Sequence, residues 1–373
     1  MSHIFVTGGT GYLGGYTAKT LLETPGTHLY LLTRGGEARA LREKLWKSWQ
    51  LHFTPQAFGA ALQRVTFIPG DLHAPGLGIA DAHRSLLTER ADSVLHIAAS
   101  LNRKSAKACL NTNLRGTLSV IQLARHLKDA GKLSRFSHVS TVAVAGHRHA
   151  EVVQEDDAID WDRSDYDPYG RTKKFCEHMV RELLPDVPKT FFRPSIVMGD
   201  STRPHTSQFD MVRAFCVLVD LPVLPLSPDV RLDIVPADWV GRAIATLHLD
   251  PKPKHSIYHL SAGHRACTAR QIAASLGAAA GRTPRFAPAL GSSFDLAVRA
   301  ANRAPRGTMV AGIGALLKVF WPYIIWDTVF DSERAVAAVG APAPFPDYAA
   351  PLYRWSKEHD FRYPHEPYPE GLE

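Results

Sequence analysis

The sequence predicts an α/β fold in which a doubly wound parallel sheet carries a smaller, mostly helical C-terminal cap. Strand-like and helix-like patterns alternate through the first two-thirds of the chain, as in sheets built from strand–helix–strand units. The strand-like runs are too apolar to face water, so we expect helices on both faces of the sheet. A glycine-rich turn joins the first run, which ends at Thr7, to the first helix-like segment.

The elements follow a regular order up to residue 200 and then change character. Further strands are expected at residues 28–34, 65–71, 93–99, 136–144 and 190–198. The helices expected between the strands cover residues 11–23, 37–49, a stretch before Arg90, 106–130 and 168–184. Proline becomes frequent after Gly199, and shorter elements follow at 231–235, 237–248, 258–261, 268–280 and within 307–328.

This change of pattern predicts two units. Residues 1–200 form the first unit, to which residues 228–262 return, and residues 201–227 and 263–373 form a cap; the motifs described next assign NADP binding to the first unit and substrate binding to the cap. The stretch 308–330 is strongly apolar, but Lys318 and Pro322 interrupt it, so we expect a buried helical lid rather than a membrane span. Contact of this stretch with a membrane surface is the alternative.

The first turn has the features of a phosphate-binding loop. Gly8 permits the tight turn, Gly11 lets the backbone approach a pyrophosphate, and Gly14 lets the helix pack on the strand. Unpaired N–H groups at the start of the helix suit phosphate oxygens. The alternative is an ordinary turn between a strand and a helix. The cofactor-binding residues predicted in this turn are Gly8, Thr10, Gly11, Tyr12, Leu13 and Gly14.

Arg34, at the end of the second strand, indicates which nicotinamide cofactor binds. A site that prefers NAD places an acidic residue near this point to bind the ribose hydroxyls. An arginine pairs instead with a 2′-phosphate, so the sequence predicts NADPH. Arg39 and Arg42 follow, and each of them taken singly is better interpreted as part of a solvated helix face.

Two further strand ends are expected at the same crevice, because the carboxyl ends of parallel strands line it. Asp71, followed by Leu72, is placed to meet the adenine, and Ala98 leaves space beside the cofactor. A simple turn residue is the alternative interpretation of Asp71.

Tyr169 and Lys173 stand four residues apart in the helix expected after the fifth strand, so they share one face of it. A nearby ammonium favours the phenolate and helps the tyrosine to act as a proton donor or acceptor. Thr141, from the fifth strand, adds a hydrogen bond to the same substrate oxygen. Tyr353 and Lys357 repeat the spacing without a preceding strand that bears hydroxyl groups, so we interpret them as an exposed helix or tail.

Together these segments resemble the extended short-chain dehydrogenase/reductase superfamily, which has a Rossmann fold. The resemblance implies that Thr141, Tyr169 and Lys173 are catalytic and that Asn113 supports the lysine through water. It also implies that three residues border the nicotinamide, namely Pro194, Ser195 and Ile196. The matching segments are residues 7–14, 71–72, 113–117, 140–141, 169 with 173, and 193–197.

Within that superfamily the chain looks most like the fatty acyl-CoA reductase and thioester reductase branch, the male-sterility type. Thr141 in the catalytic hydroxyl position and residues 232–240, 258–261 and 330–332 carry this resemblance. It implies NADPH-dependent reduction of an acyl thioester, bound to CoA or to a carrier protein, to an aldehyde, with the alcohol as the product of a second reduction. The alternative is reduction of a ketone, sterol or nucleotide sugar at the same site. A nucleotide sensor without catalysis would not need the three catalytic residues.

Composition limits the partners. The net charge of +7 favours anionic ligands such as a phosphorylated cofactor or an acidic acyl carrier protein. No basic stripe with interleaved aromatic residues is present, so we expect no nucleic-acid partner. The four cysteines have neither metal-ligand nor disulfide spacing, and the first strand leaves no room for a signal peptide. We therefore expect a cytoplasmic protein without a bound metal.

Overall fold

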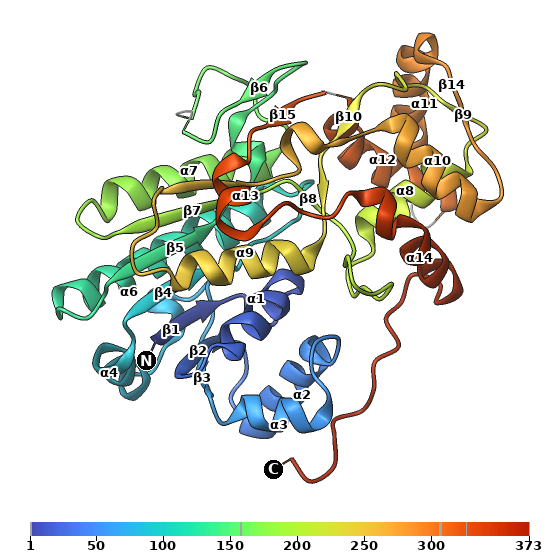
Figure 1. Ribbon diagram of the computed structural model, residues 1–373. Coiled ribbons are helices and arrows are strands. Elements are labelled where there is room, and N and C mark those ends of the chain that lie inside the picture. Colours follow the sequence, from blue (N-terminus) through green and yellow to red (C-terminus); the bar gives the residue numbers. More distant parts are fainter. Residues whose placement is uncertain (1, 157–158, 306–307, 326, 373) are drawn as a thin grey trace.

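The computed structural model describes residues 2–156, 159–305, 308–325 and 327–372. A seven-stranded sheet forms the centre of the molecule (Figure 1), in the order β12-β7-β5-β4-β1-β2-β3. Each neighbouring pair in this sheet is parallel, which confirms the predicted doubly wound α/β fold. The strands are β1 (Ser2–Thr7), β2 (Thr27–Thr33), β3 (Val65–Pro69), β4 (Ser93–His96), β5 (Arg135–Val139), β7 (Lys189–Pro194) and β12 (Ile257–Leu260).

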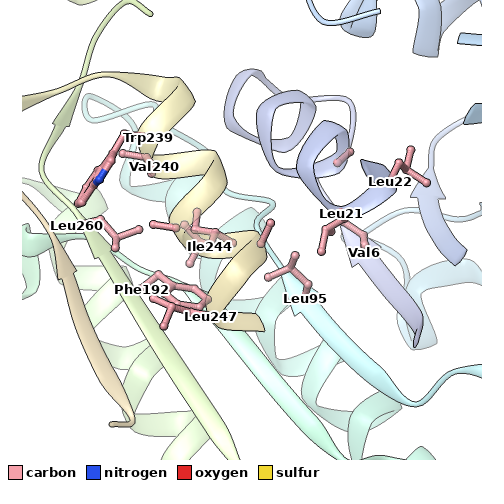
Figure 2. Packing of buried hydrophobic residues seen from close by; sticks show 14 of the residues in the cluster. Val6, Leu21, Leu22, Leu95, Phe192, Trp239, Val240, Ile244, Leu247 and Leu260 are labelled. Atoms are coloured by element: carbon pink, nitrogen blue, oxygen red, sulfur yellow. The ribbon is translucent and has the colours of Figure 1, made fainter. Parts of the chain in front are cut away.

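Helices cover both faces of the sheet and bury a separate hydrophobic cluster on each face. Figure 2 shows the first cluster, in which Ile244 and Leu247 lie with Phe192 of β7 and Leu95 of β4. Removing this apolar surface from water is the main source of stability for the fold. The helices of the first cluster are α1 (Tyr12–Glu23), α2 (Ala38–Trp49), α3 (Pro55–Leu62) and α9 (Ala237–Leu249), and those of the second are α4 (Asp81–Arg90), α6 (Gly116–Asp129) and α7 (Pro168–Leu183).

The cap has its own hydrophobic core and lies beside the sheet (Figure 1). Short strand pairs, β9 (Val223–Leu224) with β14 (Arg285–Phe286) and β10 (Arg231–Leu232) with β13 (Cys267–Thr268), join its segments. The helices that share this core are α8 (Asp210–Asp220), α10 (Ala269–Ala280), α11 (Gly291–Ala301), α12 (Met309–Ile325) and α14 (Phe345–Glu358).

Two late segments return from the cap to the dinucleotide-binding side. Helix α13 (Glu333–Val339) packs against α9 and β12. After α14 the chain runs to α2 and α3 (Figure 1), where the indole Nε1 of Trp46 donates a hydrogen bond of 2.8 Å to the Pro367 carbonyl. The cap and the sheet are therefore tied together at more than one place, and the domain boundaries given above stay a prediction.

Several expected strands are shorter than predicted or divided near the cavity described below, and the strands expected at 65–71 and 93–99 already end at Pro69 and His96. The strand expected at 136–144 ends at Val139, and a 3₁₀ turn (Val142–Ala145) follows in which the Thr141 hydroxyl accepts a hydrogen bond from Ala143 N. The strand expected at 190–198 divides into β7 and β8 (Ile196–Val197). The strand expected at 231–235 divides at Asp233 into β10 and β11 (Ile234–Val235), which pairs with β8.

The helices depart from expectation in other ways. The helix expected at 106–130 contains a π-helical turn (Leu110–Arg115) between α5 (Ala106–Cys109) and α6. Helix α3 was not anticipated, although Thr54 caps it and Pro55 begins it, and neither was α11. The interpretation of residues 353–357 as exposed was wrong for Tyr353, which is buried in the cap core on α14.

The apolar stretch 308–330 forms α12, which contains Pro322, and β15 (Val329–Phe330), which pairs with β6 (Val152–Val153). Residues 307 and 326 of the predicted stretches lie outside the described residues. Within the part of the chain that the structure describes, no helix combines the length and the apolar character needed to cross a bilayer. Contact of this stretch with a membrane surface stays a prediction.

Candidate active site

A cavity of about 750 Å³ lies between the carboxyl ends of the strands and the cap. Most of the residues singled out from the sequence line it, although they come from distant parts of the chain. Asp71 and Asn113 do not belong to its lining. The predicted residues that line the cavity are Gly8, Thr10, Gly11, Tyr12, Leu13, Gly14, Arg34, Leu72, Ala98, Thr141, Tyr169, Lys173, Pro194, Ser195 and Ile196.

The glycine turn is shaped as a cradle for a phosphate. Gly8 has a φ of +78°, and a Cβ built on it would lie 2.6 Å from the backbone nitrogen of Ala98. A Cβ on Gly14 would lie 2.0 Å from the Gly8 carbonyl oxygen, so helix α1 packs directly on the turn. Gly11 is the N-cap of α1, and no side chain caps its N–H groups. The open helix start and the close packing fit the pyrophosphate of a dinucleotide.

Arg34 is exposed, follows β2 and lines the cavity, as the prediction of a 2′-phosphate site requires. Lys44 of α2, which sequence reasoning did not single out, donates a hydrogen bond of 3.1 Å from Nζ to the Arg34 carbonyl. Partial burial and the charge of Arg34 lower the pKa of Lys44. Arg39 instead pairs with Glu43 at 3.0 Å on the exposed face of α2. The cationic side chains of Arg34 and Lys44 therefore both lie near the end of β2.

Asp71 closes the turn after β3. Its Oδ1 accepts a hydrogen bond of 2.9 Å from the backbone nitrogen of His73 and lies 3.5 Å from Nδ1 of that side chain. This geometry accounts for Asp71 as a turn residue, while the following Leu72 reaches the cavity. The contact of Asp71 with an adenine stays a prediction.

Asn113 is buried and ties the loop after β4 to helix α7. Its Oδ1 accepts a hydrogen bond of 2.7 Å from Ser100 N. Its Nδ2 donates to the Ser100 carbonyl at 3.2 Å and to the Thr172 hydroxyl at 3.1 Å. Asn113 therefore fixes the helix that carries Tyr169 and Lys173, while its link to Lys173 through water stays a prediction.

Tyr169, Thr141 and Lys173 come together at the floor of the cavity. Burial raises the pKa of Tyr169 to about 12, against the charge of Arg103 and a hydrogen bond with Thr141, which both lower it. Lys173 is buried one turn further along α7, and burial lowers its pKa. Its Nζ donates a hydrogen bond of 2.6 Å to the Val139 carbonyl and lies 3.3 Å from Nε2 of His138.

Sequence reasoning missed several polar residues of the cavity. Arg103 lies in the loop after β4, and its guanidinium carbon is 5.2 Å from the centroid of the Tyr169 ring. Tyr323 enters from the cap helix α12. Asp233 is buried, its Oδ1 accepts a hydrogen bond of 2.8 Å from Ala262 N, and burial raises its pKa. The interruption of an apolar run by Asp233 was a signal in the sequence, whereas Arg103 and Tyr323 gave none.

Among the described side chains, no group of three or more His, Cys, Asp or Glu residues could hold a metal ion. The four cysteines, all described, are free thiols.

Comparison with known proteins agrees with this geometry. Residues 6–244 match the NAD-binding family described as male sterility protein. The fatty acyl-CoA reductase wat of Drosophila melanogaster is 28% identical over an alignment of 275 residues that covers 65% of this chain and 53% of that protein. The nonribosomal peptide synthetase asaC of Aspergillus flavus is 27% identical over an alignment of 269 residues that covers 69% of this chain and 26% of that protein. The chain spans only about a quarter to a half of the length of these relatives.

Solved structures show the same fold over nearly the whole chain. The terminal R domain from the myxalamid PKS-NRPS biosynthetic pathway superposes with a TM-score of 0.81 at 23% identity, covering 97% of this chain and 92% of that chain. The reductase domain of a nonribosomal peptide synthetase from Mycobacterium tuberculosis has a TM-score of 0.74 at 19% identity, with the same coverage of 97% and 92%. The family match covers more than half of the residues, so the chain belongs to the NAD-binding family described as male sterility protein, and its cofactor is a nicotinamide dinucleotide.

Proposed function

We propose that this protein reduces an acyl thioester, bound to CoA or to a carrier protein, to an aldehyde, with NADPH as the reductant. The observation that carries this proposal is a single cavity that holds the glycine turn, Arg34, the residues Thr141, Tyr169 and Lys173, and an apolar face of the cap. The names of the relatives support it, since they include a fatty acyl-CoA reductase and an L-2-aminoadipate reductase large subunit from Penicillium chrysogenum.

The cofactor is assigned to the sheet side of the cavity. The glycine turn and the open start of α1 would hold its pyrophosphate, and Arg34 with the nearby Lys44 would hold the 2′-phosphate that distinguishes NADPH from NADH. Residues 194–196 line the same cavity and would border the nicotinamide. When bound, the cofactor supplies a hydride to the carbonyl carbon of the thioester.

The proton of the reaction comes from the chain itself. The Tyr169 hydroxyl donates its proton to the carbonyl oxygen as negative charge builds there, and the Thr141 hydroxyl donates a hydrogen bond to the same oxygen. Lys173 orients the cofactor ribose, and its positive charge favours the phenolate form of Tyr169 that remains after the proton has been donated. The resulting hemithioacetal releases the thiol and gives the aldehyde. A second round at the same site would give the alcohol.

The cap supplies the apolar wall for the acyl group. Residues 312, 315, 316, 319 and 323 of α12 line the cavity, and this spacing places them on one face of the helix. Four of these five residues, Gly312, Ala315, Leu316 and Val319, carry no polar side-chain atom. The wall excludes water from the reacting carbonyl and suits an aliphatic substituent.

The test is NADPH oxidation by the purified protein with acyl-CoA thioesters, carrier-bound thioesters and the matching aldehydes. We expect oxidation that depends on the thioester, and product analysis then separates the aldehyde from the alcohol. Tyr169→Phe should lower kcat at least about 100-fold while NADPH binding persists. Tyr353→Phe is the matched control. It removes the hydroxyl of the other tyrosine that lies four residues before a lysine, on α14, and should keep the wild-type rate. Turnover of ketones or nucleotide sugars without any thioester reaction would refute the proposal.

A further inference from the structure

Arg103 occupies a place in the cavity that no sequence motif indicates. It lies in the loop between β4 and α5, and its guanidinium carbon is 5.2 Å from the ring centroid of Tyr169. The same carbon is 5.2 Å from the ring centroid of Tyr323, which belongs to the cap helix α12. The cation therefore lies against a ring of the sheet domain and a ring of the cap, at distances typical of cation–π contacts.

Asp167 holds this arrangement together. Its Oδ1 accepts a hydrogen bond of 2.9 Å from Gly170 N and thereby caps the start of α7. Its Oδ2 accepts a hydrogen bond of 2.8 Å from the Tyr323 hydroxyl and lies 3.4 Å from Nε of Arg103. One carboxylate thus joins the loop after β4, the helix that carries Tyr169 and the cap helix.

The cap side of this cluster is also fixed by ring stacking. The rings of Tyr323 and Tyr166 lie 4.7 Å apart with an interplanar angle of 16°. Tyr323 follows directly after Pro322 in the last turn of α12. Its position therefore depends on how α12 lies over the cavity.

The charges around Tyr169 show what Arg103 contributes. Burial raises the pKa of Tyr169, and the charge of Arg103 is the largest effect that lowers it, followed by the hydrogen bond with Thr141. Asp167 and Cys109 face the same phenol and raise its pKa. The ammonium of Lys173, one turn away, donates to the Val139 carbonyl. Arg103 is thus a cation that lies directly against the phenol ring.

We propose that Arg103 is a positioning residue that acts through Tyr169, and that the Tyr323–Asp167 hydrogen bond sets its place when α12 covers the cavity. The guanidinium stabilises the negative charge left on the phenol oxygen once the proton has moved to the substrate. When α12 packs over the cavity, the same contacts therefore place Arg103 beside Tyr169 and prepare Tyr169 to donate its proton. This inference rests on the proposed function, because it takes Tyr169 as the proton donor.

The first experiment compares the steady-state kinetics of three variants with those of the wild type. Arg103→Met removes the charge and keeps a long side chain, so kcat should fall about tenfold with an unchanged affinity for NADPH. Arg103→Lys should recover part of the loss, and Tyr323→Phe should lower kcat about fivefold because only one hydrogen bond is lost. A kcat of Arg103→Met within twofold of the wild type overturns the proposal.

Arg213→Met is the matched control, because the Arg213 guanidinium lies 5.1 Å from the centroid of the Phe361 ring, and Arg213 is not among the residues that line the cavity. Loss of one Arg–aromatic contact is common to both variants. The control should keep the wild-type kcat. An equal fall in both variants would show a merely structural effect and would also overturn the proposal.

The second experiment measures the phenol without any substrate. Tyr169 is replaced by 3,5-difluorotyrosine, whose more acidic phenol titrates within the stable pH range, and its fluorine NMR signal is followed against pH. Adding Arg103→Met should raise the pKa of that phenol by about 1.5, the equivalent of a change of about 30-fold in its ionisation. An unchanged pKa overturns the inference about Arg103. A raised pKa in a protein that reduces no thioester would refute the proposed function alone.

Discussion

Replacing Gly14 by alanine tests how much of the cofactor site depends on the close packing of α1 on the glycine turn. The added Cβ would lie 2.0 Å from the Gly8 carbonyl oxygen and 2.9 Å from the Cα of Gly9. Both contacts are with backbone, which cannot rotate away as a side chain would. The turn must therefore move by about 1 Å or more from the place where the phosphates bind. We expect about 100-fold lower kcat/KM and a loss of about 1–3 kcal/mol in the free energy of unfolding.

The assay combines NADPH titration, followed by cofactor fluorescence, with urea unfolding. Gly291→Ala is the control, because its Cβ would meet no atom closer than the Pro225 carbonyl oxygen at 3.5 Å, in α11 of the cap. Alanine favours a helix over glycine by about 1 kcal/mol, so this variant should be as stable as the wild type or more so. Wild-type NADPH affinity in Gly14→Ala would refute the assignment of the turn as the pyrophosphate cradle.

Three further predictions follow from the charges and the cap. Arg34→Ala should weaken NADPH binding about tenfold and leave NADH binding nearly unchanged in parallel titrations; equal losses would contradict the 2′-phosphate assignment. Arg193→Met removes the partner of the buried Glu177 at 2.8 Å, leaves Arg181 at 3.9 Å as a weaker partner, and should cost about 3 kcal/mol in urea unfolding. Burial alone would raise the pKa of Glu177, but the charge and hydrogen bond of Arg193, together with Ser140 and Arg181, outweigh burial and lower it. The stabilisation by this pair is therefore present above the ordinary glutamate pKa, is lost as pH falls through the lowered value, and should be missing from the variant's pH–stability profile. Ala315→Phe should narrow the cap side of the cavity and lower kcat/KM about tenfold more for long-chain than for short-chain thioesters, whereas equal effects would place the acyl group elsewhere.

The sheet was predictable because its signals are local. Apolar runs such as residues 65–69 and 93–96 are short and lie between helical patterns. Residues 93–96 are buried in the sheet, and residues 65–69 form the strand at one edge of it. The glycine turn was predictable for the same reason, since Gly8, Gly11 and Gly14 lie within seven residues, between the end of β1 and the first turn of α1. Periodicity and turn chemistry are read over such distances without any knowledge of the tertiary structure.

The ends of strands were less predictable, because the same residues serve another purpose there. Residues 139–144 contain three valines and one threonine and look like a continuing strand, but the backbone turns into a 3₁₀ helix where the Thr141 hydroxyl accepts a hydrogen bond from Ala143 N. The strand predicted at 231–235 breaks at Asp233 for the same reason. The Asp233 carboxylate accepts a hydrogen bond from Ala262 N, and the strand stops at Leu232 and resumes at Ile234. Tertiary hydrogen bonds override strand propensity at these points.

The cluster around Arg103 shows why part of the site escaped sequence reasoning altogether. Arg103 and Tyr169 are 66 positions apart, and Asp167 and Tyr323 are 156 apart. None of these spacings matches a period of a helix, strand or turn, so no pattern connects them. What joins them is the contact between α12 and the start of α7, and the place of α12 depends on the cap core that it shares with four other helices. The residues predicted to be catalytic, on the sheet side of the cavity, could therefore be picked out from the sequence, whereas the groups that join them to the cap required the structure.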